Sequence, residues 1–161
     1  MEKLVGPAGL CIRWMPGVIP YTVQKSMPEF TLTHRVQFSE TDMAGVVHFS
    51  NYFRWMEMIE HAFFRSLGLS VMMTHEAVEI GWPRVACSCE FHGPARFEQE
   101  ITMKLRVIKV GGKSLSYEVD FFNGQTLLAK GKLTSVCVAL VGSSFQAIPI
   151  PEMVREKLVA S

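Results

Sequence analysis

The feature that most constrains the fold is a series of alternating apolar and polar segments, joined by turns that contain glycine. Residues 100–110 and 114–122 both alternate cleanly, as strands with one buried face do. A Gly-Gly pair at 111–112 separates them, and Asn-Gly at 123–124 follows the second. Both dipeptides are typical of tight β-hairpins. The sequence therefore predicts adjacent antiparallel strands that continue into a last and longest strand at 125–141.

One long helix precedes these strands. Apolar side chains recur at helical spacing up to Leu67, Ser50 or Asn51 can cap the start, and Gly68 can end the helix. The remaining predicted elements are strands at 31–38 and 84–92 and a short helix at 152–159. This order predicts an α+β fold in which a curved, antiparallel, five-stranded sheet wraps around one long central helix.

Size and composition exclude several classes of protein. The 161 residues suffice for one domain with a substantial core, and a net charge of +1 gives no electrostatic case for nucleic-acid binding. No apolar run approaches the 18 or so residues of a membrane span. Cysteine and histidine spacing fits no zinc site, so we expect no metal.

The first 27 residues differ from the rest of the chain. They are rich in glycine and proline, have no periodicity, and lack the continuous apolar run of a signal peptide. We expect a flexible extension at 1–27 and one domain at 28–161, although an organelle-transit role stays open. Cys87 and Cys89 lie two apart in a predicted strand and cannot easily bridge, so buried free thiols in a reducing, cytoplasmic location are expected.

The residues between the first strand and the helix carry the chemistry. Asp42 lies in a short loop with Gly45, just before the predicted helix start. A carboxylate beside free backbone N–H groups at a helix start can serve acyl-transfer chemistry. An Asx turn is the commoner fate of an aspartate in a loop, and a plain turn is an equally good account of the glycine.

The pattern Asp-x-x-Gly-Val-Val-x-x-x-Asn-Tyr, at 42–52, resembles the motif of hotdog-fold acyl-CoA thioesterases of the 4-hydroxybenzoyl-CoA thioesterase family. The element order also resembles the hotdog fold. The resemblance implies hydrolysis of a CoA thioester to a carboxylic acid and free CoA, with Asp42 as nucleophile or general base. It also implies that the backbone amide of Phe49 stabilises the oxyanion, and that Gly45 lets the loop approach the substrate.

The neighbouring residues allow more than one role. His48 either assists the reaction or caps a loop, and relatives often have an aromatic residue there. Asn51 and Tyr52 are expected to hold the loop against the helix and to contact substrate, although Tyr52 also fits an ordinary core position. Glu57 is the reserve catalytic candidate, because a different hotdog subfamily uses a helix glutamate; a solvated or subunit-contacting role is the alternative.

The resemblance also implies how CoA is held. Relatives bind the nucleotide near the turn at 111–112, often across a subunit interface. The expected contacts are Arg106, Lys109, Lys113 and Ser114, although lysines beside a turn are usually only solvated. We expect a homo-oligomer, a tetramer built as a dimer of dimers, and no cofactor beyond the CoA of the substrate.

Two other functions remain open. Hotdog enoyl-CoA hydratases and dehydratases separate their aspartate and histidine by four residues, whereas five separate Asp42 from His48 here. A non-catalytic acyl-CoA-binding regulator would need an effector domain, for which residues 1–27 are too short and too rich in proline.

Overall fold

The computed structural model describes residues 29–142 and 144–160, so the predicted extension at 1–27 lies outside the described residues. The elements, in chain order, are β1 (Glu29–Arg35), a short 3₁₀ helix (Phe38–Glu40), α1 (Ser50–Ser66), β2 (Met72–His75), β3 (Val78–Gly81), β4 (Arg84–Phe91), β5 (Glu100–Val110), β6 (Ser114–Asn123), β7 (Thr126–Val136), β8 (Val138–Val141), β9 (Ser144–Ala147) and α2 (Glu152–Ala160).

Five strands form one antiparallel sheet in the order β1-β5-β6-β7-β4. Each of these strands comes from a segment that the sequence predicted, and both predicted hairpins are present. In β5 every second residue is buried over the first eight positions, and the residues between are exposed or partly exposed, as the pattern indicated. The predicted α+β class is confirmed.

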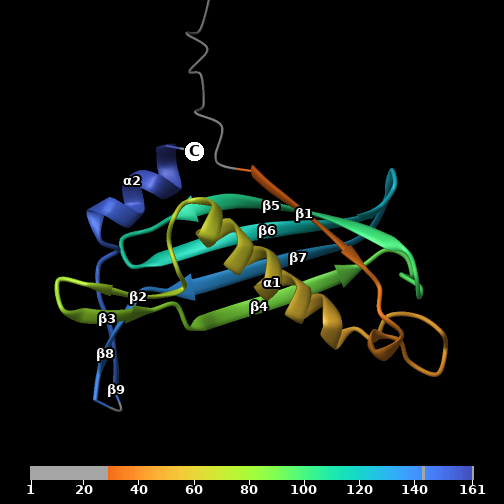
Figure 1. Cartoon of the computed structure of the whole chain (residues 1–161), viewed down its shortest axis with the longest axis horizontal. Helices are drawn as coiled ribbons and strands as arrows, with labels where there is room; N and C mark the ends of the chain where they lie inside the picture. Colours follow the sequence, from red (N-terminus) through yellow and green to blue (C-terminus); the bar gives the residue numbers. More distant parts are fainter. Residues whose placement is uncertain (1–28, 143, 161) are drawn as a thin grey trace, which may run out of the picture.

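Helix α1 lies across one face of this sheet (Figure 1). Its fully buried residues Met56, Ile59 and Phe64 belong to the same core as the inward side chains of β5 and β6. Gly131 of β7 makes the close approach possible, because a Cβ at this position would lie 2.2 Å from the sulfur of Met56. The position of α1 on the sheet therefore depends on a strand residue that has no side chain.

A second sheet was not predicted. Strands β2, β3, β8 and β9 form four antiparallel strands beside the first sheet. The prediction of one long strand over 125–141 is wrong, because the strand breaks at Cys137 and its end, β8, pairs with β3 instead. Burial of all the thiols is also wrong: Cys137 is buried, Cys89 is partly exposed and Cys87 is exposed.

Two predicted boundaries also change. The first strand ends at Arg35 rather than Phe38, whose side chain is exposed in the 3₁₀ helix. Phe49 occupies the N-cap of α1 and makes no capping bond through its side chain, so neither Ser50 nor Asn51 caps the helix. Gly68 follows the helix with φ of +66°, the left-handed geometry expected of a glycine stop.

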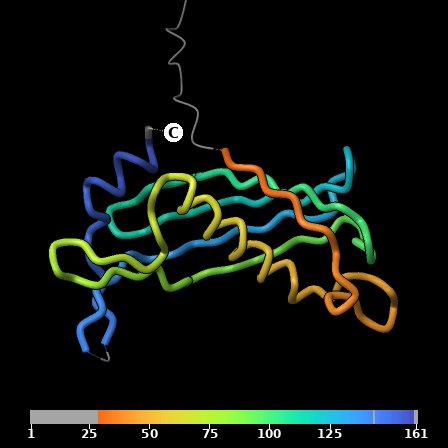
Figure 2. Tube along the Cα trace, in the orientation of Figure 1, coloured from red at the N-terminus to blue at the C-terminus, as the bar shows by residue number. Residues whose placement is uncertain are grey.

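The loop with Asp42 and the β5–β6 turn lie at opposite ends of the molecule (Figure 2). The start of β5 pairs with Arg35, close to the loop, whereas its far end reaches the turn, where Arg155 of α2 donates to the carbonyl of Gly111 at 2.7 Å. Among the described residues, neither helix combines the length and the apolar character needed to cross a membrane. The cytoplasmic location stays a prediction.

Candidate active site

The loop between the 3₁₀ helix and α1 is closed by its own backbone. The Asp42 N–H donates to the Val46 carbonyl at 2.8 Å, and the Gly45 N–H donates to the Asp42 carbonyl at 3.0 Å. Gly45 has φ of +70°, and no atom lies within 4 Å of the place that a Cβ would occupy. In this chain the backbone conformation, rather than close approach, therefore accounts for the glycine.

The Asp42 carboxylate is exposed and uses only one of its oxygens within the loop. Oδ1 accepts hydrogen bonds from the N–H groups of Ala44 at 2.8 Å and Val46 at 3.4 Å. This is the Asx turn that the sequence left open as an alternative. Within residues 29–142 and 144–160, Oδ2 accepts no hydrogen bond, so the turn fixes the carboxylate and leaves one oxygen available to a water or a substrate.

A cleft of about 350 Å³ opens beside Asp42. Its lining consists of Asp42, Val46, Val47, Phe49, Tyr52, Phe91, Gly93 and Pro94. The rings of Tyr52 and Phe91 meet edge to face with centroids 5.1 Å apart. Burial raises the pKa of the Tyr52 hydroxyl, so it stays protonated at neutral pH. The cleft therefore joins one exposed carboxylate to a mainly apolar, partly aromatic wall.

The backbone amide of Phe49 is placed at the entrance of α1. Its residue is the N-cap, and the N–H has no hydrogen-bond acceptor within the described part of the chain. The first N–H groups of a helix lack partners inside the helix and carry the positive end of its dipole. Phe49 also lines the cleft with Asp42, so the residue with the unpaired N–H and the residue with the exposed carboxylate border one cavity.

The side chains of His48 and Asn51 stabilise this entrance. His48 Nδ1 lies 2.8 Å from the Ser50 hydroxyl, and its ring packs on that of Phe49 with centroids 4.5 Å apart. Asn51 is buried and donates to the Glu40 carbonyl at 2.8 Å. Neither side chain lines the cleft beside Asp42.

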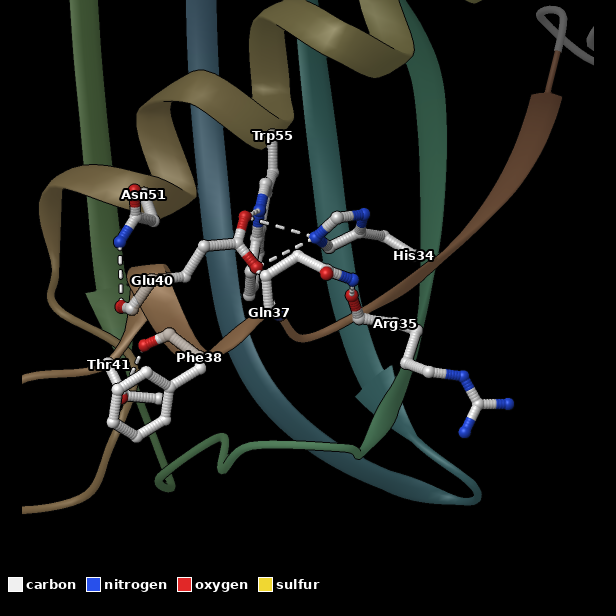
Figure 3. A network of polar contacts seen from close by, with 8 residues as sticks. All are labelled: His34, Arg35, Gln37, Phe38, Glu40, Thr41, Asn51 and Trp55. Carbon is white, nitrogen blue, oxygen red and sulfur yellow. Dashed lines mark hydrogen bonds and ion pairs between the residues drawn. The ribbon is translucent and has the colours of Figure 1, made fainter.

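Glu40 is a residue that the sequence analysis missed. Its carboxylate receives hydrogen bonds from His34 Nε2 at 2.9 Å, Trp55 Nε1 at 2.7 Å and the Gln37 N–H at 2.7 Å (Figure 3). A glutamate in a loop looks solvated from its sequence context. The available signal was its position two residues before Asp42, at the edge of the motif.

Glu57 belongs to a different cluster. It is half exposed and pairs with Arg84 at 3.2 Å and His61 at 3.8 Å. These three residues line a separate cavity of about 320 Å³ that does not include Asp42. Within one chain, the reserve catalytic candidate therefore does not share the cleft of the loop aspartate.

Behind this cluster lies a buried ion pair. Glu60, fully buried on α1, pairs with Arg84 and accepts a hydrogen bond from the Ser135 hydroxyl at 3.1 Å. Burial raises the pKa of Glu60, and the arginine opposes this effect only in part. The sequence analysis missed this residue too, although helical spacing from Met56 and Phe63 places it on the apolar face.

The residues expected to bind CoA lie away from the cleft. Arg106 pairs with Asp120 at 3.0 Å, and Lys113 donates to the carbonyl of Ala147 at 2.9 Å. Lys109 and Ser114 flank the same β5–β6 turn. The structure therefore does not bring these four residues to Asp42 within one chain, and their contact with CoA stays a prediction.

No group of three or more His, Cys, Asp or Glu side chains within residues 29–142 and 144–160 is placed to hold a metal ion. Activity without a metal or cofactor stays a prediction.

Comparison with known proteins identifies relatives over most of the chain. The sequence profile of the thioesterase-like superfamily matches residues 36–158. A 1,4-dihydroxy-2-naphthoyl-CoA hydrolase from Synechocystis is 25% identical over 78% of this chain and 92% of its own length. The 4-hydroxybenzoyl-CoA thioesterase of a Pseudomonas strain is 30% identical, over 46% of this chain and 54% of its own.

Comparison with solved structures also identifies a thioesterase as a relative. A gentisyl-coenzyme A thioesterase superposes with a TM-score of 0.68 at 27% identity, covering 78% of this chain and 99% of that one.

Proposed function

Because the chain belongs to the thioesterase-like superfamily, we propose that it hydrolyses the CoA thioester of an aromatic carboxylic acid. It is a thioester hydrolase, as are the relatives named above. The family resemblance that the motif at 42–52 indicated is thereby confirmed. The observation that carries the proposal is the exposed Asp42 carboxylate, which has one unpaired oxygen and borders a partly aromatic cleft.

Asp42 would carry out the chemical step in one of two ways. Its free Oδ2 either attacks the thioester carbonyl, giving a mixed anhydride that water then cleaves, or takes a proton from the attacking water. In both routes the C–S bond breaks, CoA leaves as a thiolate that gains a proton, and the acid is released. A thiolate leaves readily, so one carboxylate suffices without a catalytic triad.

The Phe49 N–H would stabilise the charge that develops on the carbonyl oxygen. A backbone donor at a helix start is fixed before the reaction, so it costs no reorganisation when the oxyanion forms. Its lack of another acceptor among the described residues supports this role. The His48 side chain, held by Ser50 and outside the cleft lining, is given no chemical step.

The walls of the cleft support an aromatic acyl group. Phe91 and Phe49, which line the cleft, expose 49% and 59% of their surface, and the Tyr52 ring, only 3% exposed, packs edge to face on Phe91. Aromatic rings gain from such contacts beyond simple burial. The three relatives named above act on CoA esters of aromatic acids, which agrees with this choice.

CoA contacts from the β5–β6 turn would have to come from a second copy of the chain. The β5–β6 turn, with residues 109–114, lies at the opposite end of the molecule from the loop with Asp42 (Figure 2). We therefore keep the homo-oligomer, a dimer of dimers, as part of the proposal. Light scattering that finds an active 18 kDa monomer at micromolar concentration would contradict it.

The substrate class is tested by following free thiol release from a panel of aromatic, medium-chain and long-chain acyl-CoAs. We expect the highest kcat/KM for an aromatic ester such as 4-hydroxybenzoyl-CoA. A preference for long aliphatic chains would overturn the aromatic assignment. Hydration of crotonyl-CoA without thiol release would instead identify a hydratase.

A matched pair of variants tests the cleft itself. Phe91→Ala should raise KM for the aromatic ester more than for butyryl-CoA, because only the aromatic acyl group stacks there. Phe97→Ala is the control, since Phe97 has nearly the same exposure, 48% against 49%, but lies outside the cleft. Equal effects of the two variants would argue against this acyl site.

A further inference from the structure

Glu40 joins three elements of the fold through one carboxylate. Its oxygens accept hydrogen bonds from His34 on β1, Trp55 on α1 and the Gln37 N–H at the start of the 3₁₀ helix (Figure 3). Only 16% of the side chain is exposed. Because β1 and α1 meet here, the carboxylate fixes the chain just before Asp42 relative to both.

The backbone of Glu40 also fixes the end of the loop with Asp42 that leads into α1. Its carbonyl accepts hydrogen bonds from the His48 N–H at 2.9 Å and from the Asn51 side chain at 2.8 Å. The neighbouring residues Thr41 and Val47 form a β-bridge. The residue before the loop and the residues after it are therefore joined at one point, from which the loop with Asp42 extends.

The loop has few other attachments to the body of the fold. The Val47 N–H donates to the Ala95 carbonyl at 2.8 Å, and Arg96 reaches the Gly45 carbonyl only at 3.5 Å. The bonds of the Asp42 carboxylate stay inside the loop. The direction in which Asp42 faces the cleft thus depends mainly on how the ends of the loop are held.

Glu40 is suited to this task because it is held as an anion. Burial raises its pKa, but the hydrogen bonds from Gln37, His34 and Trp55 outweigh burial and lower the pKa below its usual value. Hydrogen bonds to a charged acceptor are about twice as strong as neutral ones. A neutral amide at this position could not accept all three bonds.

We propose that Glu40 is a positioning residue, which holds the Asp42 carboxylate and the Phe49 amide in the geometry needed for thioester hydrolysis. The inference rests on the proposed function, because it requires Asp42 to be the catalytic carboxylate. Glu40 itself does not line the cleft and takes no part in the chemistry. The other explanation of its bonds is that they only stabilise the fold.

A double-mutant cycle separates these explanations. Glu40→Gln should lower kcat about tenfold with KM nearly unchanged, since small displacements of reacting groups cost up to about 100-fold. In an Asp42→Asn background the same change should have almost no effect on kcat, because no catalytic carboxylate is left to misplace. A merely structural role would lower kcat equally in both backgrounds.

The controls address folding and local chemistry. Glu100→Gln removes an exposed glutamate that pairs with Arg35 near the same loop, and should leave kcat unchanged. Trp55→Phe removes one donor to Glu40 while keeping an aromatic ring in the core, and should lower kcat by a few-fold. If Glu40→Gln fails to fold, this variant carries the test in the same Asp42→Asn cycle.

Hydrogen exchange gives a readout that does not depend on turnover. The N–H groups of Asp42 and His48 are hydrogen-bonded within the loop and to Glu40. In Glu40→Gln they should exchange faster, while the amides in the middle of β6 keep their protection. Unchanged loop exchange, or faster exchange throughout the sheet, would overturn the positioning role.

The outcomes distinguish the two proposals. If Asp42→Asn keeps most of its activity, the proposed function fails, and the exchange experiment still decides whether Glu40 orders the loop. If Asp42→Asn is inactive but Glu40→Gln leaves kcat and loop exchange unchanged, the proposed function stands and the positioning role is wrong.

Discussion

Replacing Gly131 by alanine should destabilise the protein by crowding α1. The new Cβ would lie 2.2 Å from the sulfur of Met56 and 3.2 Å from its Cγ, whereas ordinary contacts lie at 3.4–4 Å. Met56 is fully buried, so its side chain has to change rotamer inside a packed core. Overpacking of this kind costs about 1–3 kcal/mol, and the lower chain entropy of alanine offsets about 0.5–1 kcal/mol of it. The expected net loss is about 0.5–2 kcal/mol.

Urea unfolding at one fixed protein concentration, followed by tryptophan fluorescence, measures this loss. Gly112→Ala is the matched control, because no atom lies within 4 Å of its added Cβ and its φ is not in the left-handed region. The cause is tested by combining Gly131→Ala with Met56→Ala, which alone should cost about 2–5 kcal/mol. The double variant should lose less than the sum of the two single losses, since the new methyl group fills part of the cavity. If the losses of the two single variants simply add in the double variant, the predicted clash between the new Cβ and Met56 is wrong.

Two further predictions concern the carboxylates of Glu40 and Glu60. The pKa of Glu40 is lowered in the folded protein, so its ionisation stabilises the fold above the usual value of 4.5, and this contribution is lost as pH falls through the folded pKa. Between pH 5 and 3, the free energy of urea unfolding should therefore fall more steeply for the wild type than for Glu40→Gln. Parallel curves for the two proteins would contradict this prediction. Arg84→Met leaves Glu60 buried without its cation, at a cost of about 3–5 kcal/mol. Because burial raises the pKa of Glu60, proton uptake relieves part of this cost at low pH. The loss of unfolding free energy caused by Arg84→Met should therefore be larger at pH 8 than at pH 5. Equal losses at the two pH values would show that Glu60 is not ionised in the wild type.

Strong periodicity made the main sheet and α1 predictable from the sequence. The alternation in β5 and the Asn-Gly turn before β7 leave few other folds for that half of the chain. The second sheet could not be predicted in the same way, since β2, β3 and β9 have only four residues each and are too short to show a hydrophobic periodicity. The break at Cys137 was hidden because this single residue separates β7 from β8, and no glycine or proline marks a turn there.

Part of the candidate site could likewise be predicted from the sequence, and part could not. The motif located Asp42 and the helix entrance, because their spacing is local. The wall contributed by Phe91, Gly93 and Pro94 was missed, since only the folded sheet brings the end of β4 to the start of α1. The bonds of Glu40 were missed for the same reason, because two of the three donors to its carboxylate, His34 and Trp55, lie on β1 and α1.

The most direct test of the account is kcat of Asp42→Asn with the best substrate of the acyl-CoA panel. The substitution keeps the shape of the side chain and removes its charge, so both nucleophilic attack and general-base catalysis are lost. We expect kcat to fall by about 100-fold or more with KM little changed, while Glu57→Gln stays within about twofold of the wild type. If Asp42→Asn keeps more than about a third of the activity and Glu57→Gln abolishes it, the catalytic carboxylate lies on α1 and the account is wrong.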